Sequence, residues 1–218
     1  MIKQTKITIA SIIFLLVAII DIYAVISLNK SLEIIFKPLL MTVLVIVYLL
    51  SVKKANFWLV SALFFSFWGD VFLLDKTNYF LFGLASFLIA HVMYIKMVSK
   101  FLKKHSFFNV LKAVFIFITL FAGVLFVIKD NLSEMLVPVI VYGITISVFG
   151  ACSLLNYQQE KSLTNLCLLL GAILFIASDS LIALNNFYKP LLYFDISIIV
   201  LYIFSQYLIC KSLILKDT

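Results

Sequence analysis

The sequence contains no arginine and few charged residues of any kind, which together make up 12% of its 218 positions. The lack of arginine argues against a bidentate guanidinium clamp on phosphate. Two histidines are too few for the multi-histidine sets that catalytic zinc prefers, so we expect no metal site. Cys152, Cys167 and Cys210 lie inside apolar segments at unrelated spacings, so we expect them to pack and not to form disulfides.

Apolar residues dominate what is present. Hydrophobic residues account for 65% of the chain and its mean hydropathy is +1.20, whereas ordinary globular proteins are roughly 45–50% apolar. This composition indicates a protein that crosses the membrane several times. The first apolar run, Ile7–Leu28, follows Lys3 and Lys6 but has no clear small-residue cleavage site, so we interpret it as a retained span.

Charged and polar breaks divide the chain into eight apolar segments, each close to the roughly 20 residues that a bilayer requires. We expect membrane helices at residues 7–28, 34–51, 57–74, 79–99, 107–128, 133–155, 164–184 and 191–213. The breaks are too short to hold a soluble domain. We therefore predict an all-α, polytopic bundle that forms a single transmembrane domain over residues 1–218.

The lysines indicate how the bundle is oriented. The net charge of +7 comes from lysines in short loops, a pattern that suits a lipid bilayer and not nucleic acid. With a cytoplasmic N-terminus, twelve lysines lie on the cytoplasmic side and five on the other, which favours two cytoplasmic termini. The third and seventh spans then both run outward. Asp70 and Asp179 would lie about one turn inside the outer face, level with Lys37, while Asp21 falls in the outer half of its span and His91 near the middle of the fourth.

Two carboxylates at this depth are candidates for chemistry. An ionised carboxylate in the bilayer costs at least about 2.5–3.5 kcal/mol, so an intramembrane aspartate indicates function by default. The structural alternative is that each aspartate makes a helix-helix hydrogen bond or an ion pair with a lysine. The presence of two aspartates, Asp70 and Asp179, at the same depth as Lys37 makes this purely structural role less favoured. Ser66 shares the Asp70 face at i−4, and Ser178 directly precedes Asp179.

Other polar side chains lie within the spans. His91 has Tyr94 on its helix face, and Tyr202 and Gln206 share a face at i, i+4. Tyr142 lies in the sixth span. Each of these residues fits either the wall of a pocket or a contact between helices, and the sequence leaves both open.

Six stretches of the chain together resemble the YhhN-like lysoplasmalogenase family of multi-pass membrane proteins. They are KPLL at 37–40, FSFWGDVFLL at 65–74, FGLASFLIAHVMYI at 82–95, PVIVYG at 138–143, GAILFIASDSLIALNNF at 171–187 and LYIFSQYLI at 201–209. The Gly-Asp, Ser-Phe-x3-His-x2-Tyr and Ser-Asp-Ser elements are specific in combination. Trp68 and Asn186 are minor departures from the family pattern.

The resemblance implies hydrolysis of the vinyl ether bond of lysoplasmalogens, giving a fatty aldehyde and glycerophosphocholine or glycerophosphoethanolamine. Such chemistry needs one carboxylic acid that donates a proton and a second carboxylate, as in glycosidases. We assign Asp70, which has aromatic neighbours, as the donor, and Asp179 as the ionised partner. Lys37 is the candidate for the substrate phosphate, and His91 with Tyr94 for orienting the glycerol or the water.

The remaining expectations follow from the same resemblance. The substrate pocket would also include Ser66, Tyr142, Ser178, Tyr202 and Gln206. We expect a lysophospholipid (ether lipid) substrate, no cofactor, and a place in a bacterial cytoplasmic membrane; the oligomeric state is open.

Rival functions use the same acids. A proton-coupled transporter is the main alternative, because transporters also use acidic side chains within the membrane to bind and move protons. The sequence has only 6 glycines and no pattern of paired broken helices, which disfavours a transporter. An intramembrane aspartyl protease would need Tyr-Asp and Gly-x-Gly-Asp signatures, but Asp70 follows Trp-Gly and Asp179 follows Ala-Ser. A purely structural protein would tolerate Asp→Asn at both positions.

Overall fold

A computed structural model describes residues 2–217 of the chain, and within them lie eight α-helices and two short 3-10 helices. The α-helices are α1 Ile2–Ile26, α2 Lys30–Ser51, α3 Phe57–Leu73, α4 Lys76–Ser99, α5 Phe107–Ile128, α6 Leu136–Gln159, α7 Leu163–Phe187 and α8 Leu192–Asp217, and the 3-10 helices are η1 Lys129–Asn131 and η2 Ser133–Met135. The expected all-α bundle of eight helices is confirmed.

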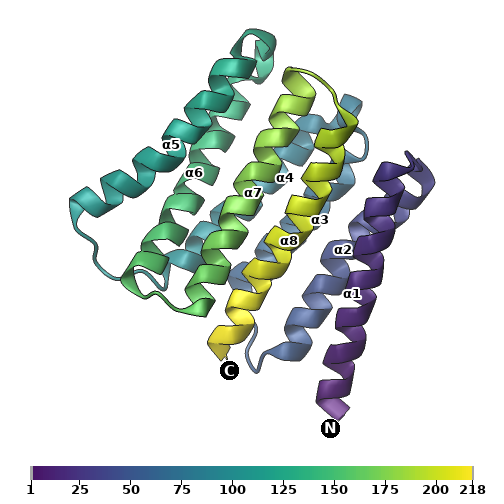
Figure 1. Cartoon of the computed structure of the whole chain (residues 1–218), viewed down its shortest axis with the longest axis vertical. Helices are drawn as coiled ribbons and strands as arrows, with labels where there is room; N and C mark the ends of the chain where they lie inside the picture. The colour runs from purple at the N-terminus through teal and green to yellow at the C-terminus, as the bar shows by residue number, and fades with distance from the viewer. Residues whose placement is uncertain (1, 218) are drawn as a thin grey trace.

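The helices run up and down side by side (Figure 1), with α1 and α2 at one edge of the bundle and α5 and α6 at the other. Both termini lie at the same end of the bundle. We call the opposite end, which the chain reaches after α1, α3, α5 and α7, the mouth end. The two cytoplasmic termini inferred from the lysines remain a prediction.

Helix length and composition make this a multi-pass integral membrane protein. Among the described residues, seven helices are long and apolar enough to cross a bilayer. The remaining one, α3, has 17 residues and a length of about 25 Å, at the short limit for a span. Many large apolar side chains are exposed on the outer surface of the bundle, for example Phe115 at 67% and Phe126 at 71%, as expected for a surface that faces lipid.

The polar breaks that divide the sequence act as helix N-caps. Each capping side chain accepts a hydrogen bond from a backbone N–H in the first turn of the helix it precedes, which stabilises a helix start by about 1 kcal/mol. The caps are Asn29 for α2, Asn56 for α3, Asp75 for α4, Ser106 for α5 and Ser162 for α7.

The start of α2 differs from the sequence prediction. We expected the second span to begin at residue 34, but the Asn29 cap starts the helix at Lys30. Lys37 and Pro38 therefore lie about two turns inside α2. Pro38 has no N–H to donate to the preceding turn. Lys37 therefore projects from within α2 and not from its first turn.

Small residues bring the central helices close together. Gly171 of α7 packs on α8, where the Ser205 hydroxyl donates to the Gly171 carbonyl oxygen at 2.8 Å. A Cβ atom at position 171 would lie 3.0 Å from the Ser205 carbonyl oxygen. This close approach is typical of membrane helices that pair through small residues, and it fixes α7, which contains Asp179, against α8.

Candidate functional site

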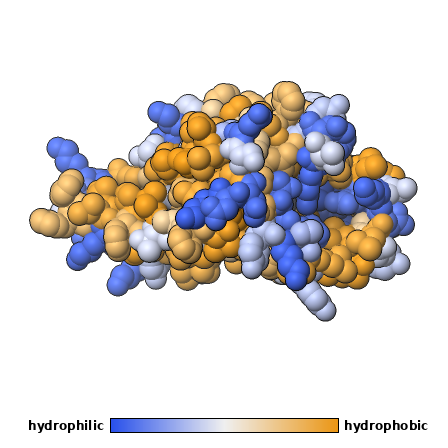
Figure 2. All heavy atoms as spheres, turned by 90° about the horizontal axis from the view of Figure 1, so that it is seen from above, coloured by the Kyte–Doolittle hydropathy of each residue, from blue (hydrophilic) through white to orange (hydrophobic). Residues whose placement is uncertain are grey.

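A cavity of about 340 Å³ opens at the mouth end, and side chains of α1, α2, α3, α4, α7 and α8 line it. Figure 2 looks onto this end and shows hydrophilic residues across its centre and at several points along its edge, among hydrophobic residues. The charged residues that line this main cavity are Lys30, Glu33, Lys37, Asp70, Asp75, Lys76, Asp179 and Asp195. The cavity therefore joins a charged entrance to two aspartates set deeper in the helices.

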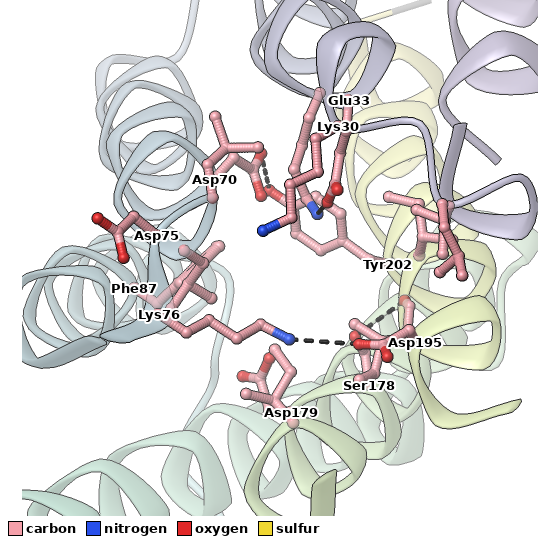
Figure 3. A pocket seen from close by; sticks show the side chains of 18 of the residues that line it. Lys30, Glu33, Asp70, Asp75, Lys76, Phe87, Ser178, Asp179, Asp195 and Tyr202 are labelled. Atoms are coloured by element: carbon pink, nitrogen blue, oxygen red, sulfur yellow. Dashed lines mark hydrogen bonds and ion pairs between the residues drawn. The ribbon is translucent and has the colours of Figure 1, made fainter. Parts of the chain in front are cut away.

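Asp70 enters the main cavity from α3 and is almost completely buried, at 3% exposure. The Tyr202 hydroxyl of α8 donates a hydrogen bond to Asp70 Oδ2 at 2.8 Å (Figure 3). The Phe87 ring packs edge-on against Tyr202, with ring centroids 5.9 Å apart. Asp70 thus has one polar partner from another helix and an aromatic side chain beside that partner.

Asp179 enters the same cavity from α7, and its side chain is 8% exposed. The Tyr142 hydroxyl of α6 donates to Asp179 Oδ2, and His91 Nε2 of α4 lies 3.8 Å from the same oxygen. His91 Nδ1 lies 2.8 Å from the Phe87 carbonyl oxygen. Because a carbonyl can only accept, Nδ1 carries the hydrogen, and Nε2 of a neutral ring presents its lone pair toward Asp179.

Lysines and carboxylates form ion pairs at the entrance. In Figure 3 the Lys76 side chain reaches across the opening from α4 toward α8, where its ammonium lies 3.3 Å from Asp195 Oδ1. Lys37 Nζ lies 2.6 Å from Glu33 Oε1 on the same helix. These pairs place two ammonium groups at the entrance, each beside a carboxylate of the protein.

Five of the ten residues predicted from the sequence line the main cavity. They are Lys37, Asp70, Ser178, Asp179 and Tyr202. The Ser178 hydroxyl donates to the Ile198 carbonyl oxygen at 3.1 Å and so also ties α7 to α8. Tyr142 and His91 reach Asp179 from behind, as described above. Their substrate-binding roles remain predictions.

Tyr94, Gln206 and Ser66 form a separate hydrogen-bonded chain. The Tyr94 hydroxyl donates to Gln206 Oε1 at 2.5 Å, and Gln206 Nε2 donates to Ser66 Oγ at 3.2 Å. All three residues are fully buried, and they are not among the described residues that line the main cavity. Their position joins α4, α8 and α3 beneath the site, which fits the helix-contact interpretation that the sequence left open.

Several entrance residues were not proposed from the sequence. Lys30, Glu33, Asp75 and Lys76 lie in or next to polar breaks, so we interpreted them as loop residues. The sequence signal for these residues was their place next to the mouth-end limits of the spans that contain Lys37 and Asp70. Asp195 lies inside the last apolar segment, and the rule that selected Asp70 and Asp179 could have selected it too.

The sequence profile of the YhhN family matches residues 32–213 of the chain. No curated protein and no solved structure matches the chain. The matched region begins at the third residue of α2 and includes all of the cavity-lining residues named above except Lys30.

Proposed function

We propose that this chain, which belongs to the YhhN family, is a lysoplasmalogenase-type hydrolase. The family includes lysoplasmalogenases. The proposed reaction cleaves the vinyl ether bond of a lysoplasmalogen and yields a fatty aldehyde together with glycerophosphocholine or glycerophosphoethanolamine. The observation that supports it most is the presence of two carboxylates, Asp70 and Asp179, in one cavity that also has lysines at its entrance.

Acid catalysis suits a vinyl ether. A proton delivered to the β-carbon of the double bond leaves an oxocarbenium ion on the carbon that bears the ether oxygen. Water adds to that carbon and loses a proton, which gives a hemiacetal. The hemiacetal hydroxyl then loses its proton as the bond to the glycerol oxygen breaks; the glycerol oxygen takes up a proton, and the aldehyde forms. One carboxylic acid and one carboxylate can move all of these protons, as they do in glycosidases.

We assign proton delivery to Asp70 and proton acceptance to Asp179. The support for this division is the surroundings of each acid. Each acid accepts a hydrogen bond from a tyrosine hydroxyl, Asp70 from Tyr202 and Asp179 from Tyr142. The difference is that Asp179 also has a basic nitrogen nearby, the Nε2 atom of His91 at 3.8 Å. An imidazole lone pair behind Asp179 could take over the proton that Asp179 removes from water. In this scheme Lys37, Lys30 and Lys76 hold the phosphate at the entrance.

The test of this proposal is aldehyde release by purified protein in detergent, with Asp70→Asn and Asp179→Asn as the variants. Each variant should remain folded and lose turnover, because asparagine has a similar shape but neither donates nor accepts the required proton. Ser197→Ala on α8, a residue that does not line the main cavity, is a control and should keep full activity. Near-normal turnover in either aspartate variant contradicts the two-carboxylate mechanism.

The same assay separates the proposal from proton-coupled transport. A transporter would use Asp70 and Asp179 to carry protons and would leave the lipid intact. Aldehyde that accumulates in proportion to the amount of wild-type protein favours the hydrolase. Lipid that remains intact in the presence of folded protein favours the transporter.

A further inference from the structure

A second, smaller cavity of about 50 Å³ adjoins the main cavity and is lined by side chains of α3, α4, α6 and α7; we call it the side cavity. Leu73, Phe87, Asp179 and Ile182 line both spaces. The two cavities therefore meet at Asp179, one of the two acids of the proposed reaction.

The linings of the two cavities differ in chemistry. Beyond the four shared residues, the side cavity is lined by Phe80, Leu84, Val139, Tyr142, Ala183 and Phe187. These side chains are apolar apart from Tyr142, whose hydroxyl donates to Asp179. Among the described residues that line the side cavity, Asp179 alone is charged, whereas the main cavity has eight charged side chains. A molecule that fills both spaces must be an amphiphile whose polar and apolar parts join near Asp179.

We propose that the side cavity binds the part of the substrate's hydrocarbon chain that lies next to the ether oxygen, while the headgroup occupies the main cavity. This inference rests on the proposed function and names a chain-binding site for it. It places the vinyl ether, which lies between headgroup and chain, beside Asp179. Ala183 and Leu84 then act as specificity-determining residues, because their side chains border the path of the chain.

The size of the side cavity limits how much of the chain it holds. Ala183 is one helical turn and Phe187 two turns from Asp179, which is about 6 and 12 Å along α7. The rings of Phe80 and Phe187 meet edge to face, 5.4 Å apart, and border the far part of the cavity. The cavity is not enclosed, and α4, α6 and α7 are all candidate membrane spans. The rest of a long chain would therefore continue into the bilayer, and total chain length should have little effect on turnover.

The first test fills the side cavity by the substitution Ala183→Phe. Ala85→Phe is the matched control, because Ala85 lies on the exposed surface of α4 and lines neither cavity. Each protein is assayed with a long-chain alkenyl lysophosphoethanolamine and with an ethenyl ether that has no further chain. We expect Ala183→Phe to lower kcat/KM for the long-chain lipid about 10-fold or more, a size typical of pocket exclusion, and to leave the ethenyl ether unchanged. Ala85→Phe should alter neither value.

Equal loss on both substrates, or no loss on the long-chain lipid, overturns the chain-binding site. Leu84→Ala provides a second variant in case Ala183→Phe does not fold. It enlarges the side cavity and should raise kcat/KM for a lipid branched beside the double bond relative to the unbranched lipid. An unchanged ratio between these two lipids overturns the inference as well.

The second test does not depend on turnover. A non-cleavable alkyl lysophosphoethanolamine with a diazirine on the chain near the ether is photolysed with wild-type protein, and the labelled peptides are identified by mass spectrometry. Labelling of Leu84 or Ala183 that excess unlabelled lipid suppresses supports the site. Suppressible labelling at Val25 or Ile198, which line only the main cavity, overturns it, as does the absence of suppressible labelling. If label enters the side cavity but no aldehyde is ever released, the proposed function fails and the lipid site stands.

Discussion

Gly69 on α3 is a position beside one of the two acids where the addition of one methyl group should disturb the site. It directly precedes Asp70 and faces the Phe87 ring of α4. A Cβ atom built at Gly69 would lie 2.5, 2.6 and 2.8 Å from three carbon atoms of that ring. Non-bonded carbon atoms prefer separations of about 3.5–4.0 Å, so Gly69→Ala must push the ring away by about 1 Å.

The Phe87 ring packs against other rings on one side and borders both cavities on the other, so a push from Gly69→Ala displaces it within the site. It packs edge-on against Phe175 and Tyr202, at centroid distances of 6.2 and 5.9 Å, and it is 4% exposed. Overpacking of this kind costs about 1–3 kcal/mol. Gly123→Ala is the matched control, because a Cβ atom at Gly123 on α5 meets nothing within 4 Å. Both substitutions gain about 1 kcal/mol of helix propensity, so the difference between the two variants isolates the clash.

Thermal unfolding in detergent, followed by tryptophan fluorescence, measures this difference. Trp58 and Trp68 both lie on α3, so the signal reports on the helix that is disturbed. We expect Gly69→Ala to unfold at a lower temperature than Gly123→Ala and to lose turnover, because the displaced ring presses on Tyr202, the partner of Asp70. If Gly69→Ala is as stable as Gly123→Ala, the close packing of α3 on α4 described here is wrong.

Three further predictions concern the site and its entrance. Tyr202→Phe removes the donor to the buried Asp70; it should cost about 1–3 kcal/mol in thermal unfolding and lower kcat, and no change in either value would argue against this hydrogen bond. Lys37→Ala should raise KM with little change in kcat if the ammonium holds the substrate phosphate, whereas a loss of kcat alone would move Lys37 into the chemistry. At the exposed N-cap of α4, the hydrogen bond from the Asn78 side chain holds the pKa of Asp75 below its usual 3.8. The cap therefore stabilises α4 above that pH and loses its effect as the pH falls through the folded-state pKa. Asp75→Ala should unfold earlier than wild type at about pH 6 but by a smaller margin at about pH 3; an equal margin at both would contradict the charge-dependent cap.

The two acids of the site could be predicted because each can be recognised in the sequence without knowledge of its partners in the fold. A charge within an apolar segment is conspicuous, and the alternation of spans determines which acids share an end of the bundle. Asp70 and Asp179 lie in the third and seventh helices, so an even number of crossings separates them. Their common cavity follows from that parity and from depth.

The partners of the acids could not be predicted in the same way. Tyr202 is 132 positions from Asp70, and Lys76 is 119 positions from Asp195. Such pairs depend on the rotation of each helix about its own axis, which apolar periodicity defines poorly when lipid and core both favour hydrophobic side chains. The same ambiguity explains why Gln206 was predicted as a pocket wall but lies in a buried chain of hydrogen bonds beneath the site.

The start of the second helix was also missed, for a local reason. The count of apolar residues placed the start of the second span at residue 34. In the structure the helix starts four residues earlier, at Lys30, where the Asn29 side chain caps it. Charged residues in the first turns of a membrane helix lower a hydropathy count without ending the helix. Lys30 and Glu33 were therefore taken for loop residues, although both line the main cavity.

The most direct test of the proposed hydrolase compares two lysophospholipids that differ only in the bond to the chain. Purified wild-type protein in detergent is given an alkenyl or an acyl lysophosphoethanolamine, and the release of aldehyde, fatty acid and glycerophosphoethanolamine is measured. The two-carboxylate account predicts that wild-type protein releases aldehyde and glycerophosphoethanolamine from the alkenyl lipid and does not cleave the acyl lipid. The Asp70→Asn and Asp179→Asn variants should release neither product from the alkenyl lipid. Release of glycerophosphoethanolamine from the acyl lipid at an equal rate would contradict it and indicate a general lysophospholipase.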